Sequence, residues 1–121
     1  MALKRKYGQD SWSLCDGDET VLTVRETGEN NQVTVALAGS LRRDAEQFIQ
    51  DELIALSTVG VDIVLDCKEL TYIANACQLA LLNVQKRMDS MERGTLTLRN
   101  VPPEIYAGFE KTNLHELLAI E

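Results

Sequence analysis

Short runs of β-branched and aliphatic residues alternate with longer helix-type runs along this chain, and this alternation limits the possible folds most strongly. Residues 61–66 are short and apolar, which predicts a strand buried on both faces of a sheet. Residues 95–99 predict a further strand. Residues 20–27 and 32–38 predict two more, joined by the turn-type sequence 28–31. Strands that alternate with helices predict an α/β fold with helices covering the sheet, and the opening hairpin makes the sheet mixed.

Three segments have the period of amphipathic helices. The first follows Asp44, which is expected to cap it, and ends at Gly60. The second spans about 75–91 and is expected to end at Gly94. The third begins at Pro102, and a short apolar element follows it. The predicted order is β-β-α-β-α-β-α plus a short C-terminal element. One apolar stripe of the second helix predicts its core face: Cys77, Ala80, Leu81, Val84, Met88 and Met91.

The chain of 121 residues is long enough for one domain with one hydrophobic core. Residues 1–19 show no clear period, so we expect an N-terminal tail or a loosely docked lead-in. Residues 20–121 are expected to form the folded domain. Gly39 is expected to end the second strand of the hairpin.

The net charge of −7 disfavours nucleic acid and anionic membrane surfaces as partners. No apolar run approaches the ~20 residues that span a bilayer, which predicts no direct membrane insertion. The three cysteines, Cys15, Cys67 and Cys77, form neither a disulfide framework nor a metal motif. Their number and spacing, together with the lack of an apolar signal segment, predict a cytoplasmic location.

The sequence offers few groups for catalysis. His115 is the only histidine, which excludes a multi-histidine metal site, and beside Glu116 it is more simply a solvated surface residue than an acid–base group. Cys77 lies near a helix start, where a thiol can become nucleophilic, but its place on the apolar stripe favours a small core residue. Asp62 and Asp66 share a strand face, and Asp66 is expected to accept backbone hydrogen bonds. We therefore predict no catalytic residues, no metal and no cofactor.

The face of the second helix opposite its core stripe carries Leu79 and Leu82 in adjacent turns. An exposed leucine pair can be ordinary surface, or it can be the centre of a protein-binding patch. The segment that leads into the helix would border such a patch. The predicted partner-binding residues are Tyr72, Ala74, Asn75, Ala76, Gln78, Leu79 and Leu82.

Four segments resemble the STAS domain, a family named for sulfate transporters and anti-sigma factor antagonists. Residues 33–41 are similar to the family's strand that ends in Gly-x-Leu, and residues 63–73 to its apolar strand, Asp and aromatic–Ile pair. Residues 80–98 and 113–118 are similar to its second helix with the next strand and to its closing segment. The resemblance covers about residues 20–120. It implies a STAS-like mixed β-sheet covered by helices.

The regulatory motif of this family is Asp-Ser-Ser-Gly at the start of the second helix, and these positions read Ala74-Asn75-Ala76-Cys77 in this chain. In phosphorylated members, the serine that matches Ala76 accepts a phosphoryl group from an anti-sigma kinase, and its charge breaks the partner complex. Because Ala76 has no hydroxyl, the resemblance implies that the switch is absent at this site. Phosphate on Thr71 instead would restore it. Arg42 stands where many members carry Asp.

The resemblance implies a non-catalytic module that binds an anti-sigma factor or a related serine-kinase-like protein with an ATPase fold. Residues 76–82 are also similar to a subgroup with Ala or Thr at the phosphorylation position. That subgroup implies an alternative: an accessory subunit bound to the ATPase of a lipid-transport ABC system, or a chemotaxis-associated STAS scaffold. A small-molecule sensor or enzyme is a third hypothesis, which the lack of a catalytic set disfavours.

Overall fold

The computed structural model describes residues 3–121, which form one mixed sheet with helices. In chain order, the elements are β1 (Lys4–Tyr7), β2 (Ser11–Asp16), β3 (Glu19–Glu29), β4 (Gln32–Leu41), the 3-10 turn η1 (Arg43–Ala45), α1 (Glu46–Val59), β5 (Asp62–Ile73), α2 (Asn75–Met91), β6 (Leu96–Arg99), α3 (Pro103–Lys111) and the 3-10 turn η2 (Leu114–Glu116).

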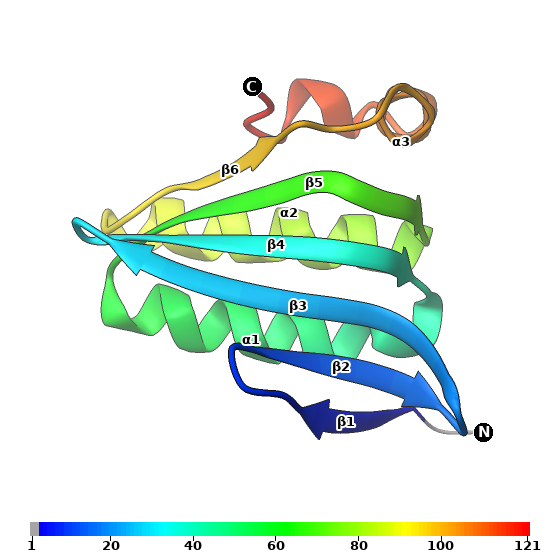
Figure 1. Ribbon diagram of the computed structural model, residues 1–121. Coiled ribbons are helices and arrows are strands. Elements are labelled where there is room, and N and C mark those ends of the chain that lie inside the picture. Colours follow the sequence, from blue (N-terminus) through cyan, green and yellow to red (C-terminus); the bar gives the residue numbers. More distant parts are fainter. Residues whose placement is uncertain (1–2) are drawn as a thin grey trace.

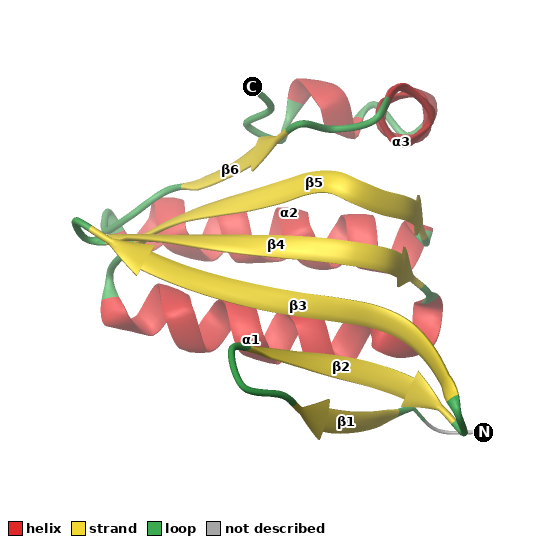
Figure 2. Cartoon of the chain, viewed as in Figure 1, coloured by secondary structure: helices red, strands yellow, loops and turns green. Residues whose placement is uncertain are grey.

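The six strands lie in the sheet in the order in which they occur in the chain (Figure 2). Strands β1 to β4 pair antiparallel, whereas β4 with β5 and β5 with β6 pair parallel. The crossover helices α1 and α2 lie side by side on one face of the sheet, and α3 lies beyond the β6 edge (Figure 1). The predicted α/β class and the STAS-like mixed sheet covered by helices are confirmed.

The core lies between the sheet and the helices, because alternate strand residues point toward α1 and α2. Val35 and Leu65 are register partners and fully buried, and Leu37 is buried on the same face. The predicted stripe of α2 packs onto this layer, with Cys77 and Met88 fully buried, whereas Met91 at its end is only half-buried. The predicted bounds of α2, about 75–91, agree with the structure.

The N-terminal segment differs from the expected tail. Residues 4–7 and 11–16 form β1 and β2, which extend the sheet beyond β3, while residues 1–2 of the predicted tail lie outside the described residues. Ser11-Trp12-Ser13-Leu14 does alternate polar and apolar residues, with Trp12 and Leu14 buried. The alternation is only four residues long, so flanking charged and glycine residues obscured it.

Three predicted element boundaries also need correction. Gly39 does not end its strand but lies inside β4, where a Cβ atom would come 2.3 Å from the backbone oxygen of Val21 in β3. Asp44 does not cap α1: it lies in η1, and its carboxylate binds Arg42 instead. Helix α2 ends with Glu92 in the left-handed conformation, two residues before Gly94. The predicted helix end at Gly60 is confirmed.

Arg5 attaches the N-terminal strands to α1. Its guanidinium carbon lies 4.0 Å from the centre of the Trp12 ring and 5.7 Å from that of Phe48 in α1. Arg5 also lies 3.6 Å from the Glu52 carboxylate in α1. Glu26 of β3 points into the same region, and its Oε2 atom is buried without a hydrogen-bond partner among the described residues. One arginine thus faces two carboxyl groups.

This arrangement predicts a stability that decreases as pH rises. Burial, and then the neighbouring Glu52, raise the pKa of Glu26 from 4.5 to about 7, although Trp12 and Arg5 act in the opposite direction. The folded state therefore binds this proton more tightly than the unfolded state. Its stabilising contribution is complete below pH 4.5 and is lost as pH rises through about 7. Urea unfolding across this range should give a free energy of unfolding that decreases.

The matched control is Glu26→Gln, which keeps the shape of the side chain and removes its titration. We expect the decrease between these pH values to become clearly smaller in the variant. An identical pH dependence in both proteins would contradict the assignment to Glu26.

Candidate functional site

The candidate site lies where β4 and β5 end. Because these neighbouring strands are parallel, their carboxyl-terminal ends lie side by side at the same end of the sheet. The starts of η1 and α2 lie there too (Figure 1). Leu41 and Ile73, the last residues of β4 and β5, are register partners. The backbone N–H of Ala74 then donates to the carbonyl oxygen of Leu41 at 2.9 Å, so the start of α2 is tied to the end of β4.

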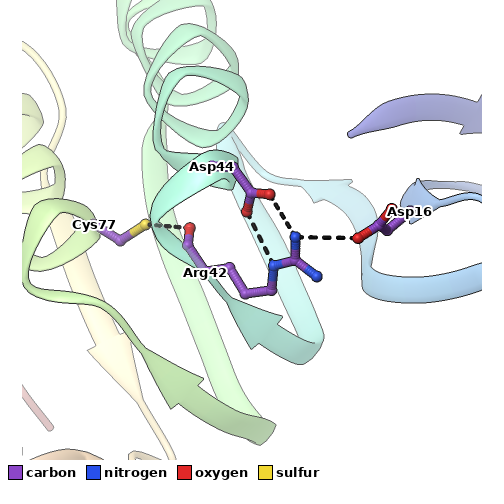
Figure 3. Close-up of polar contacts among 4 residues, drawn as sticks. All are labelled: Asp16, Arg42, Asp44 and Cys77. Carbon is purple, nitrogen blue, oxygen red and sulfur yellow. Dashed lines mark hydrogen bonds and ion pairs between the residues drawn. The ribbon is translucent and has the colours of Figure 1, made fainter. Parts of the chain in front are cut away.

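Cys77 makes the second connection between the two segments. Its thiol donates to the carbonyl oxygen of Arg42, with the sulfur 3.3 Å from that oxygen (Figure 3). The side chain is fully buried. Burial, followed by the charges of Glu46 and Asp44, raises the pKa of the thiol to about 12. A buried thiol that stays protonated at neutral pH is a poor nucleophile, which favours the structural interpretation of Cys77.

The Arg42 side chain holds the neighbouring loops together. Its Nε atom lies 3.1 Å from Oδ1 of Asp44, and its Nη2 donates to Oδ2 of the same carboxylate and to Asp16 at 3.4 Å (Figure 3). The hydrogen bond from Arg42 lowers the pKa of Asp44, although burial acts in the opposite direction. Arg42 therefore links the β2–β3 turn to the β4–α1 connection beside the start of α2.

Fewer of the predicted partner-binding residues are exposed than the sequence indicated. Leu79 is 55% exposed, and Tyr72 of β5 is 53% exposed. Leu82, in contrast, is only 8% exposed, and Gln78 is 2% exposed. Leu82, Gln78 and the buried Ala74 were all predicted to bind a partner and are not available on the surface. Asn75 is exposed and Ala76 is half-buried.

The face of α2 that carries Gln78, Leu82 and Gln85 is covered by the C-terminal segment. Gln78 accepts a hydrogen bond from the Thr112 hydroxyl, which follows α3, at 2.9 Å. Gln85 donates to the carbonyl oxygen of Leu117 and accepts from the N–H of Ala119. Leu82 lies between the two glutamines on the same helical face. Residues 78, 82 and 85 are spaced i, i+4 and i+7, so they share one face of the helix. This spacing was the sequence signal that could have predicted a second buried face.

We define the docking surface as the four predicted residues that are not buried: Tyr72, Asn75, Ala76 and Leu79. Three of them are on the first two turns of α2, and Tyr72 is on β5 immediately before it. None of the four carries a carboxylate, amine, thiol or imidazole group. The half-exposed ring of Tyr72 and methyl groups of Leu79 belong to the large apolar side chains of this surface.

The other candidate residues do not come together. His115 lies 4.0 Å from the Glu116 carboxylate, and its ring packs edge-on against Tyr106. Asp66 accepts from the backbone N–H of Lys68 at 3.1 Å, as predicted, and also from Asn100 at 3.1 Å. Within residues 3–121, no group of three or more possible metal ligands occurs. None of the helices described is long and apolar enough to cross a membrane.

Comparison with known families identifies the class. The sequence profile STAS_2, described as "Mlab, STAS domain", matches residues 24–119, and the chain therefore belongs to the STAS domain family. None of the curated proteins matches the sequence.

Several solved structures share the fold. A putative anti-sigma factor antagonist from Thermotoga maritima has a TM-score of 0.73 at 15% identity, over 80% of this chain and 84% of that protein. The unphosphorylated anti-sigma factor antagonist SpoIIAA has a TM-score of 0.68 at 15% identity, over 81% and 87% of the two chains. An antagonist from Mycobacterium paratuberculosis gives 0.69 at 11% identity, over 82% and 84%. The fold is that of anti-sigma factor antagonists of the SpoIIAA type.

The hydrogen bond between Thr112 and Gln78 gives a test of how firmly the C-terminal segment covers α2. Thr112→Val leaves the buried Gln78 oxygen without its hydroxyl donor, which is expected to lower the free energy of unfolding by about 1–3 kcal/mol. Thr58→Val is the matched control, since Thr58 also bonds to a helix carbonyl but to no buried side chain. Equal losses in both variants, measured by urea unfolding, would contradict this role of Gln78.

Proposed function

We propose that this STAS domain is a non-catalytic protein-interaction module whose docking surface is Tyr72, Asn75, Ala76 and Leu79. The partner is an anti-sigma factor or a related serine-kinase-like protein with an ATPase fold. The exposure of Leu79 carries the proposal. Leu79, in the second turn of α2, is 55% exposed, whereas Leu81 and Leu82 of the same helix are buried.

The surroundings of Leu79 support a rigid docking surface. The start of α2 is held by the bond from Ala74 to Leu41 and by the bond from Cys77 to Arg42. Tyr72, an aromatic residue of the kind enriched at protein interfaces, is more than half exposed beside it. A surface held in one geometry loses little conformational entropy when a partner binds.

The family's phosphorylation switch is absent from the proposed surface. Residues 74–77 contain no hydroxyl group, and the resemblance to the family implies that the half-buried Ala76 matches the phosphorylated serine. Thr71 is exposed, but its hydroxyl donates to the carbonyl oxygen of Gly39 at 2.9 Å. Partner binding is therefore proposed to be independent of phosphorylation.

Incubation with a cognate anti-sigma kinase and ATP should leave residues 74–77 unmodified in intact-mass and peptide-mapping spectra. The chemical reason is that none of these residues carries the hydroxyl group that a serine kinase phosphorylates, and the Cys77 thiol is fully buried. An Ala76→Ser variant is the informative control, because it restores an acceptor at the family's position. Phosphate on Thr71 of the wild-type protein would contradict the unregulated mechanism.

The alternative is an accessory subunit of a lipid-transport ABC system or a chemotaxis-associated scaffold. Two observations favour this alternative. The matching family is described as "Mlab, STAS domain", and the sequence around Ala76 is similar to the subgroup that contains such subunits. The same docking surface would serve, but with the ATPase of the transporter as partner. We also propose a cytoplasmic location for either function, because all three cysteines are free and buried.

Leu79→Asp should weaken partner capture while the domain stays folded, since it places a charge in the centre of an apolar contact. The tagged full chain would be used to recover partners from the native lysate, and mass spectrometry would identify them. An anti-sigma factor or kinase lost from the variant supports the first function. An ABC ATPase lost from the variant supports the alternative.

The matched control is Leu117→Asp, which changes a leucine of nearly equal exposure, 54%, outside the docking surface. We expect it to recover the same partners as the wild type. Recovery of every specific partner by the Leu79 variant at the wild-type level would refute the proposed surface.

A further inference from the structure

The face of the sheet opposite α1 and α2 carries a second feature, which the proposed function does not use. Figure 1 shows both helices behind the sheet, and no described element covers the middle of its other face. A hollow of about 310 Å³ lies there over β4. This volume is at the lower end of the range for small-molecule pockets.

Strand register explains the hollow. Arg25 of β3, Ala36 of β4 and Asp66 of β5 are register partners and form one row across the sheet. Thr23, Ala38 and Glu69 form the next row. The two alanines give β4 a low floor, and the larger side chains of β3 and β5 stand on either side, two strand spacings or about 10 Å apart.

A β-bulge completes the β5 wall of the hollow. The register between β4 and β5 shifts between Ala36 and Ala38, so that Ala38 pairs with Glu69 and not with Lys68. As a result, the consecutive residues Lys68 and Glu69 are both exposed and both line the hollow. Bulges commonly redirect side chains in this way next to functional sites.

The charged groups of the hollow are balanced but not paired with one another. Among the described residues, neither Arg25 nor Lys68 lies within ion-pair distance of a carboxylate. Asp66 is held in place through Oδ1 by the N–H of Lys68 and by Asn100. Its Oδ2 atom has no hydrogen-bond partner among the same residues. A cation on one wall therefore faces a fixed carboxylate on the other, across a floor of methyl groups.

We propose that this hollow binds a free apolar α-amino acid. The planar guanidinium of Arg25 donates two hydrogen bonds to the ligand carboxylate, the geometry in which arginine binds carboxylates best. Oδ2 of Asp66 accepts from the ligand ammonium group. The apolar side chain lies on the methyl groups of Ala36 and Ala38. A simple anion would meet Asp66 and Glu69, and a simple cation would meet Arg25 and Lys68, so only a zwitterion satisfies both walls.

The test uses L-leucine as the probe and backbone amide NMR shifts of the full chain as the measurement. We expect saturable shifts at Arg25, Ala36 and Asp66. Two analogues separate the contacts: 4-methylpentanoate lacks the ammonium group and 3-methylbutylamine lacks the carboxylate. Each should bind at least about tenfold more weakly than L-leucine, which corresponds to the loss of one charged contact.

Two variants localise the binding. Arg25→Gln removes the carboxylate contact, and Ala36→Leu fills the floor, so both should lose the saturable shifts. Arg87→Gln is the control, because Arg87 is an exposed arginine on α2, on the other side of the sheet. It should bind L-leucine as the wild type does. The proposal is overturned if wild-type shifts are absent, lie away from the hollow, or persist in both the Arg25 and Ala36 variants.

Discussion

The parallel pairing of β4 with β5 is the contact on which the rest of this structure depends. It brings the ends of the two strands to the same end of the sheet. There Ala74 donates a hydrogen bond to Leu41, and Cys77 donates one to Arg42. The same pairing places Ala36 beside Asp66 on the other face. Both the docking surface and the hollow are therefore consequences of one strand register.

Helix α2 packs against the sheet, the neighbouring helix α1 and the C-terminal segment, and its outer face is free. Its Cys77–Met88 stripe packs on the sheet, and its Gln78–Gln85 face is covered by the C-terminal segment through side-chain hydrogen bonds to Thr112, Leu117 and Ala119. Gln85 makes this contact with backbone groups of Leu117 and Ala119 that lie outside helices and strands, and Gln78 makes it with the Thr112 hydroxyl. The face that stays exposed carries Leu79 near the start of the helix and polar residues such as Asn83 and Lys86 further along.

Strong periodicity predicted the fold well, and weak or ambiguous periodicity accounts for what was missed. The apolar stripe of α2 gave its bounds and core residues because many positions repeat. Strand β2 was missed because only Trp12 and Leu14 alternate with serines. Leu82 was placed on the surface because a helix that packs on two sides has an apolar arc wider than one stripe. Tertiary contacts from residues 112–119, far along the chain, decide that burial.

Thiol labelling would measure most directly whether α2 leaves Leu79 free while its neighbouring turn is covered. The native cysteines Cys15, Cys67 and Cys77 are all buried, so a cysteine introduced at 79 or 82 would react against a quiet background. We predict that Leu79→Cys in the folded protein reacts at the rate of an exposed thiol and that Leu82→Cys is strongly protected. Equal reactivity at the two positions, or protection of position 79, would contradict the account.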